Sequence, residues 1–101
     1  MAGLKAAFIA EAAFRQEIVL TLIALPILFF IHLSLVAKGL IFISLMLILI
    51  TELLNSSIEA VVDRISMEIH PLAKQAKDIG SAAVFLSLVN FVVMCIIAFM
   101  L

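Results

Sequence analysis

The chain has 101 residues, of which 67% are hydrophobic, and its mean hydropathy is +1.43. Soluble domains are about 45–50% apolar, so this composition excludes an ordinary soluble domain and predicts a membrane protein with a single domain over residues 1–101. The net charge of −1 gives no reason to expect a nucleic-acid partner.

Residues 1–17, MAGLKAAFIAEAAFRQE, are rich in alanine and moderately amphipathic. Their apolar side chains can face lipid while Lys5, Glu11 and Arg15 face water or lipid headgroups. This pattern is typical of a helix that lies in the membrane interface, and we expect it to continue into the first membrane span. Glu11 and Arg15 are four residues apart, so their spacing alone also allows a simple surface ion pair.

Three apolar segments are each long enough for an α-helix to cross the hydrocarbon core, which takes about 20 residues. The predicted transmembrane helices cover residues 18–37, 39–64 and 79–101. Helices are expected because backbone polar groups must be paired inside the bilayer. Pro26 lies within the first span and is expected to kink it. Lys38 and Gly39 are expected to close a short turn.

Pro71 predicts the start of the helix that leads into the third span. A proline disfavours helical geometry at the preceding residue, His70, and suits the first turn of a new helix. We therefore expect a loop over residues 66–70. Cys95 lies deep in the last apolar run, where a packed or lipid-facing role is expected.

The basic residues indicate the orientation of the chain. Lysine and arginine side chains lie before the first span and in or near the loop between the second and third spans, whereas Lys38 alone lies on the other side. Cytoplasmic segments carry the excess of basic residues. The N-terminus and the second loop are therefore expected in the cytoplasm, and the C-terminus outside.

A polar stripe follows the apolar part of the second span. At about 100° per residue, Asn55, Ser56, Glu59 and Asp63 fall within about 60° of Glu52 on one helix face. A charge at the bilayer centre costs at least about 3 kcal/mol. Because Glu52 lies deepest of these acids, we expect it to be functional. Asn55 and Ser56 also allow a simpler role, joining two membrane helices.

A third polar group opens the last predicted helix. One helix face carries Lys74, Lys77, Asp78 and Ser81. The opposite face is a strip of small residues: Ala76, Gly80 and Ala83. Small residues allow close contact between membrane helices. A solvated helix face is the commoner explanation for the charged residues.

Carboxylates and lysines at a membrane surface together suggest a phosphoryl-transfer site. Mg²⁺ prefers oxygen ligands and often binds one or two carboxylates plus substrate phosphates, and lysine suits phosphate. A glutamate at the edge of the membrane can act as a general base toward a hydroxyl. The sequence has no G-x-x-x-x-G-K-[ST], H-R-D or D-F-G motif, so the common kinase folds are excluded. Proton or ion transport stays open as the alternative.

Three blocks of the sequence closely resemble the prokaryotic diacylglycerol kinase family of small integral-membrane lipid kinases. They are EAAFRQE (Glu11–Glu17), ELLNSSIEAVVDRI (Glu52–Ile65) and AKDIGSAAV (Ala76–Val84), in the family's order and spacing. The resemblance implies a homotrimer with shared active sites in the bacterial cytoplasmic (inner) membrane. It implies transfer of the γ-phosphoryl group of MgATP to diacylglycerol, giving phosphatidic acid and ADP. Family members usually begin with a longer amphipathic segment, of which GLKAAFIAE is the part seen here.

The same resemblance implies roles for individual residues. Glu52 corresponds to the catalytic base that takes the proton from the lipid hydroxyl. Glu11 and Glu59 correspond to the acids that bind the metal and contact ATP. The further ATP-binding residues implied are Glu68, Ile69, His70, Lys77 and Asp78. The implied lipid-substrate positions are Ala13, Phe14, Arg15, Gln16, Glu17, Glu52 and Ser81. Asn55 and Asp63 also match, in support of the site.

Two other functions stay open from the sequence. The stretch HPLAK at His70–Lys74 is similar to relatives that phosphorylate undecaprenol, whereas the FRQE and NSSIEAVVDR blocks favour the diacylglycerol branch. A non-enzymatic, proton-conducting membrane bundle would use the acidic stripe as a relay. Such a bundle would need no cytoplasmic Lys–Asp pair.

Overall fold

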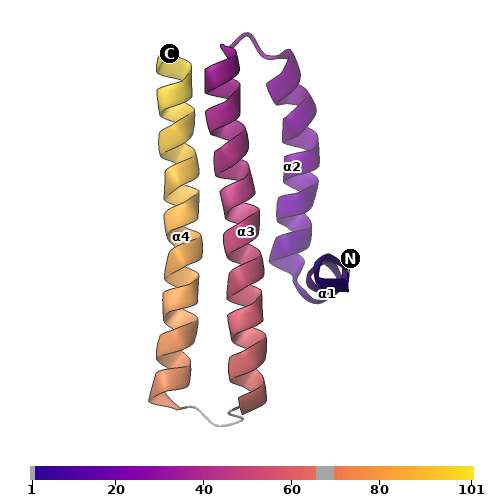
Figure 1. Cartoon of the computed structure of the whole chain (residues 1–101), viewed down its shortest axis with the longest axis vertical. Helices are drawn as coiled ribbons and strands as arrows, with labels where there is room; N and C mark the ends of the chain where they lie inside the picture. Colours follow the sequence, from indigo (N-terminus) through magenta and orange to yellow (C-terminus); the bar gives the residue numbers. More distant parts are fainter. Residues whose placement is uncertain (1, 66–69) are drawn as a thin grey trace.

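The computed structural model describes residues 2–65 and 70–101. Within these ranges the chain forms helices and no strand. The helices are α1 (Ala2–Ala10), α2 (Ala12–Phe30), α3 (Leu35–Ile65) and α4 (Pro71–Met100). Figure 1 shows α2, α3 and α4 side by side, with α1 lying across their direction near the start of α2. The prediction of an all-helical fold is therefore confirmed for the described residues.

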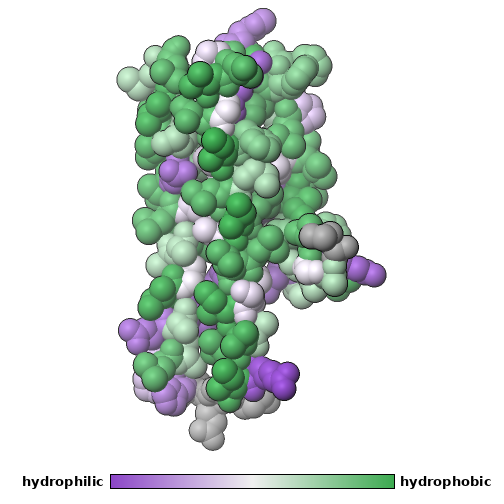
Figure 2. All heavy atoms as spheres, in the orientation of Figure 1, coloured by the Kyte–Doolittle hydropathy of each residue, from purple (hydrophilic) through white to green (hydrophobic). Residues whose placement is uncertain are grey.

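The helices α2, α3 and α4 are each long and apolar enough to cross a membrane. Helix α3 has 31 residues, so at 1.5 Å per residue it is about 46 Å long and exceeds the ~30 Å hydrocarbon core. Figure 2 shows a mainly hydrophobic surface, with hydrophilic groups gathered at the end of α3 and α4 that is joined by their loop. The last turns of α3, with Glu59 and Asp63, thus extend toward water.

A single residue, Glu11, separates α1 from α2. Its backbone is extended (φ −113°, ψ 110°), so the helix expected to continue through residue 17 is broken here. The Glu11 N–H still donates to the Ala7 carbonyl at 2.9 Å, and its carbonyl accepts from the Arg15 N–H at 3.1 Å. Alanine-rich sequence favours an unbroken helix, so local propensity did not reveal this turn.

The connection from α2 to α3 lies at residues 31–34, so the turn predicted at Lys38–Gly39 was wrong. The Ser34 hydroxyl accepts a hydrogen bond from the Ala37 N–H at 3.1 Å, as a helix N-cap does. Lys38 and Gly39 lie inside α3, and Lys38 Nζ donates back to the Phe29 carbonyl at 2.9 Å. The serine cap decides the helix start, and helix α3 accommodates the glycine.

Helix α4 begins at Pro71, as the sequence predicted. His70 is its N-cap, with an extended backbone (φ −106°, ψ 138°), and His70 Nδ1 accepts from the Leu72 N–H at 3.1 Å. The rest of the predicted loop, residues 66–69, lies outside the described residues.

Helices α3 and α4 pack along their length through positions spaced alternately by three and four residues. On α3 these buried and half-buried positions are Ala37, Ile41, Ser44, Ile48, Thr51 and Asn55. On α4 they are Gly80, Val84, Ser87, Phe91, Met94 and Ala98. This is the repeat that keeps one seam of each helix against its partner. The apolar core of Ala37, Ile41, Leu45 and Ala98 also receives Ala24 and Leu28 from α2, which joins the three long helices.

Candidate active site

Three carboxylates lie within electrostatic range of the Glu52 carboxylate, where α1, α2 and α3 meet. Glu11 lies at the α1–α2 corner, Glu17 in α2, and Glu52 and Glu59 in α3. The charges of Glu17, Glu11 and Glu59 all lie near enough to act on half-buried Glu52. Such like charges repel one another unless a cation or a proton compensates. The predicted residues Glu11 and Glu59, and also Glu17, thus lie within electrostatic range of Glu52.

The Glu11 carboxylate neither caps helix α2 nor pairs with Arg15, although its position allowed both. It makes no capping hydrogen bond at the start of α2. The ion pairs within the described ranges are Lys74–Asp78 and Lys77–Asp63, so the Glu11–Arg15 pair allowed by the spacing is not formed. The carboxylate is therefore available for another partner.

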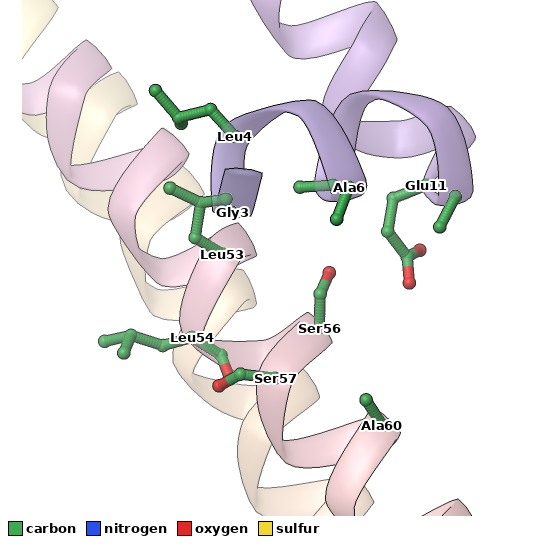
Figure 3. A pocket seen from close by; sticks show the side chains of 11 residues that line it. Gly3, Leu4, Ala6, Glu11, Leu53, Leu54, Ser56, Ser57 and Ala60 are labelled. Carbon is green, nitrogen blue, oxygen red and sulfur yellow. The ribbon is translucent and has the colours of Figure 1, made fainter. Parts of the chain in front are cut away.

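An apolar groove of about 640 Å³ lies between α1 and α3 (Figure 3). Its apolar lining includes Leu4, Ala7, Ala10, Leu53 and Leu54. Its polar lining is Glu11, Ser56 and Ser57. Figure 3 shows the Glu11 carboxylate and the Ser56 hydroxyl on the two sides of the same space. A largely apolar groove with a few polar groups suits an amphiphilic ligand.

The polar stripe of α3 is divided between two neighbours. Ser56 lines the groove on the α1 side, whereas Thr51 and Asn55 meet α4. The Thr51 hydroxyl donates to the Ser87 hydroxyl at 3.0 Å, and Asn55 Oδ1 is buried without a hydrogen-bond partner in the described part of the chain. Residues that share a stripe by helical angle therefore serve different contacts.

Gly80 makes room for the Asn55 side chain. Gly80 is buried, and a Cβ at this position would overlap Asn55 Oδ1. Of the predicted small-residue strip, Ala76 is half-buried and Ala83 is exposed, so the strip contributes mainly through Gly80. Absence of a side chain at Gly80 is thus what lets α3 and α4 lie close beside the carboxylates.

An ion pair between Lys77 and Asp63 joins the start of α4 to the end of α3. Lys77 Nζ lies 2.5 Å from Asp63 Oδ1, and the side chains are 41% and 63% exposed. Asp78 pairs instead with Lys74 on its own helix, at 2.6 Å. The predicted nucleotide-binding residues Lys77 and Asp78 thus have separate partners in this structure. Exposed pairs of this kind contribute at most about 1 kcal/mol, so both can exchange partners readily.

The other predicted nucleotide contacts are at the start of α4. His70 is exposed and caps the helix. Glu68 and Ile69 lie outside the described residues. Their predicted contact with a nucleotide stays a prediction.

The predicted lipid-substrate positions are in the first turns of α2 and near Gly80. Ala13, Gln16 and Ser81 are exposed. Phe14 is only 2% exposed, so its side chain packs inside the fold. Arg15 is half-buried and makes hydrogen bonds to α1. Sequence reasoning missed these two hydrogen bonds, because they depend on the break in the helix at Glu11.

The family model for prokaryotic diacylglycerol kinase matches residues 1–99. This chain belongs to the prokaryotic diacylglycerol kinase family. The diacylglycerol kinase of Pseudomonas aeruginosa is 51% identical over 88 residues, which cover 87% of this chain and 72% of the relative. The diacylglycerol kinase of Escherichia coli K12 is 50% identical over 91 residues, which cover 90% of this chain and 75% of the relative. The diacylglycerol kinase of Haemophilus influenzae is 48% identical over 86 residues, which cover 85% of this chain and 73% of the relative.

The resemblance carried by the three sequence blocks is therefore confirmed. Membership of a kinase family implies ATP as co-substrate, and the three apolar helices fit a multi-pass membrane protein. The names of the relatives favour neither undecaprenol kinase nor a proton-conducting bundle.

Proposed function

We propose that this chain is a lipid kinase that transfers the γ-phosphoryl group of ATP to diacylglycerol, giving phosphatidic acid and ADP. The observation that carries the proposal is that Glu11, Glu17 and Glu59 all lie within electrostatic range of Glu52 in a chain of this family. These carboxylates lie where the apolar helices approach water. There the acyl chains of a lipid can stay in the bilayer while its hydroxyl meets a water-soluble nucleotide.

Glu52 is the proposed general base. A helix that enters the membrane at Leu35 crosses the ~30 Å hydrocarbon core in about 20 residues, which places Glu52 close to the far boundary. Its carboxylate takes the proton of the lipid hydroxyl as that oxygen bonds to the γ-phosphorus and the bond to the β-phosphate oxygen breaks. The proton then passes to water. This chemistry requires no covalent phosphoenzyme.

Glu11 and Glu59 are the proposed ligands of Mg²⁺. Their carboxylate oxygens are the donors that Mg²⁺ prefers, and the ion commonly takes only one or two of them with phosphates and water. Because no three His, Cys, Asp or Glu side chains form a metal site by themselves in the described residues, phosphates and water would have to complete the coordination. When bound, the ion neutralises charge that develops on the phosphates.

The nucleotide is proposed to lie over the start of α4. Lys77 turns its Nζ from Asp63 to a phosphate oxygen, and Asp78 contacts the nucleotide together with the segment Glu68–His70. The lipid headgroup lies against the first turns of α2, residues 13–17, and Ser81. Asn55 supports the site through its contact with Gly80.

We also propose a homotrimer in the bacterial inner membrane. The single chain is only 16 Å across in its shortest dimension, and apolar side chains such as Phe30 and Leu35 are 77% and 86% exposed. Neighbouring copies would cover part of this surface and share the active sites. The α1 helix would lie in the cytoplasmic interface, with the α3–α4 connection in the cytoplasm and the C-terminus outside.

The purified protein in lipid nanodiscs, supplied with MgATP labelled in the γ-phosphate, tests this function. Diacylglycerol and undecaprenol are assayed in parallel, with the Glu52→Gln variant as the control for contaminating kinases. We expect labelled phosphatidic acid and little undecaprenyl phosphate. Faster labelling of undecaprenol would overturn the substrate assignment. Transfer to neither lipid, together with ion flux in vesicles, would overturn the kinase itself.

A further inference from the structure

The last carbonyls of α1 have their hydrogen-bond partner in another helix. Because the chain leaves helical geometry at Glu11, these carbonyls lose the N–H groups that a continuing helix would supply. Arg15 of α2 replaces them: its Nη1 donates to the Phe8 carbonyl at 3.0 Å and to the Ile9 carbonyl at 2.7 Å. We refer to these two bonds as the Arg15 clamp.

The Arg15 clamp is well suited to hold a short helix. A cation is favoured at a helix C-terminus by the partial negative charge there, and hydrogen bonds from a charged donor are stronger than neutral ones. Helix α1 has only 9 residues, too few to be stable by itself in water. Its position therefore depends on contacts such as these.

Arg15 also contacts the backbone of Glu11 itself. The Arg15 N–H donates to the Glu11 carbonyl at 3.1 Å, while the guanidinium binds the carbonyls two and three residues before Glu11. Glu11 is thus held from both sides, and its own carboxylate makes no capping bond. The Glu11 side chain lies beside the groove between α1 and α3 (Figure 3).

We infer that Arg15 is a positioning residue, which fixes the α1–α2 corner and thereby holds the Glu11 carboxylate at the groove, near Glu52. This inference rests on the proposed function for the role of Glu11 in holding Mg²⁺. It differs from direct contact with the lipid substrate, which the family resemblance implies for Arg15. The two roles make opposite predictions about which kinetic constant changes.

The clamp itself is tested without any activity measurement. Lys5 is exposed on α1, so trypsin cleavage after Lys5 in nanodisc-embedded protein reports how often α1 detaches, with the released peptide quantified by mass spectrometry. We expect cleavage to be roughly tenfold faster in Arg15→Gln, which loses the charge-assisted bonds. Arg15→Lys, which keeps a cation, should cleave at an intermediate rate. Arg64→Gln, which removes an exposed arginine at the end of α3, is the matched control and should be cleaved after Lys5 at the wild-type rate.

The positioning role is tested by kinetics on the same variants. We expect Arg15→Gln to raise the Mg²⁺ concentration for half-maximal activity several-fold, with the KM for diacylglycerol within twofold of the wild type, and Arg15→Lys to restore much of the difference. A raised KM for diacylglycerol with unchanged Mg²⁺ dependence would overturn the inference in favour of lipid contact. Unchanged cleavage at Lys5 would overturn the clamp.

Two further results separate this inference from the proposed function. If the wild-type protein transfers phosphate to no lipid, the proposed function fails, while the cleavage rates still decide whether the clamp exists. If Arg15→Gln does not fold, Arg15→Lys carries the test, because faster cleavage and a raised Mg²⁺ requirement are expected there too, to a smaller extent. A folded Arg15→Lys protein with the wild-type cleavage rate and the wild-type Mg²⁺ requirement would then count against the inference.

Discussion

The two halves of the α3–α4 pair follow the same spacing but use different chemistry. In the outer half, near the α2–α3 connection, Ala37, Ile41 and Leu45 pack with Ala98 in an apolar cluster. In the site half, near the carboxylates, Thr51 bonds to a serine of α4 and Asn55 lies against Gly80. Apolar packing tolerates a small shift of one helix along the other. The Thr51–Ser87 hydrogen bond and the Asn55 amide above Gly80 can form in only one register of the two helices. The polar contacts beside the candidate site, with Gly80 above all, therefore add a geometric constraint on the register that the apolar half lacks.

Glu52→Gln should have the largest effect, because the amide cannot take the proton of the lipid hydroxyl. We expect kcat to fall by roughly 10²–10⁴-fold, with the fold and assembly state unchanged. A lipid phosphorylation assay measures kcat, and light scattering of the purified variant measures its assembly state. The matched control in the outer half is Ser44→Ala, which changes a buried polar residue of the same helix and should keep kcat within about twofold. Near-normal turnover in Glu52→Gln would remove Glu52 as the base.

Gly80→Ala should have the next largest effect, because the added methyl overlaps Asn55 Oδ1. Overpacking of this kind typically costs about 1–3 kcal/mol, and the displaced α3–α4 contact should also lower kcat. Gly39→Ala is the comparison in the outer half, where an added Cβ meets nothing within 4 Å. It should be neutral, or stabilising by up to about 1 kcal/mol. Thermal unfolding in detergent and kcat are measured for both variants. Equal losses of stability and kcat in Gly80→Ala and Gly39→Ala would contradict the expected difference between the two halves.

Lys77→Gln should raise the KM for ATP by about tenfold, the effect of losing one charge-assisted hydrogen bond. Lys74→Gln removes the same charge one turn earlier on α4, where Lys74 pairs with Asp78 at the surface, and should change KM by less than about threefold. Initial rates at varied ATP measure both. Similar KM values for the two variants would mean that general charge, and not a specific contact, attracts the nucleotide.

Ser87→Ala should have the smallest effect. It removes the hydrogen bond from Thr51, and such bonds between membrane helices average only about 0.6 kcal/mol. Thr51 keeps the carbonyls of Leu47 and Ile48 as partners. We expect stability to fall by less than about 1 kcal/mol, with kcat nearly unchanged. Chemical unfolding curves test this, and a loss above about 2 kcal/mol would show that this hydroxyl pair dominates the register.

The sequence predicted those parts of the fold that depend on strong local signals. Long apolar runs gave the three long helices, and Pro71 gave the start of α4. The break at Glu11 and the Ser34 cap were missed, since neither a glycine nor a proline marks them. Both depend on side chains reaching the backbone of a neighbouring turn or helix, as Arg15 and Ser34 do.

The candidate site shows the same limit. A helical angle places Asn55 and Ser56 about 100° apart, but it does not say that one meets Gly80 and the other the groove. The alternate spacing of small and polar residues along α4, including Gly80 and Ser87, is the signal that would have identified the seam with α3. No comparable signal exists for Arg15, whose partners depend on the tertiary turn at Glu11.

Helix α2 is shorter than its neighbours, and this has a consequence for the surrounding lipid. Its 19 residues span about 28 Å, close to the thickness of one bilayer core. The Arg15 clamp holds one end of α2, and Lys38 holds the carbonyl of Phe29 near the other. Hydrophobic mismatch with a thicker or thinner membrane would act on α2 first. Bilayer thickness would then set the depth of Glu11 relative to Glu59 on the longer α3, and under the proposed function the host membrane would itself adjust the spacing of the two metal ligands.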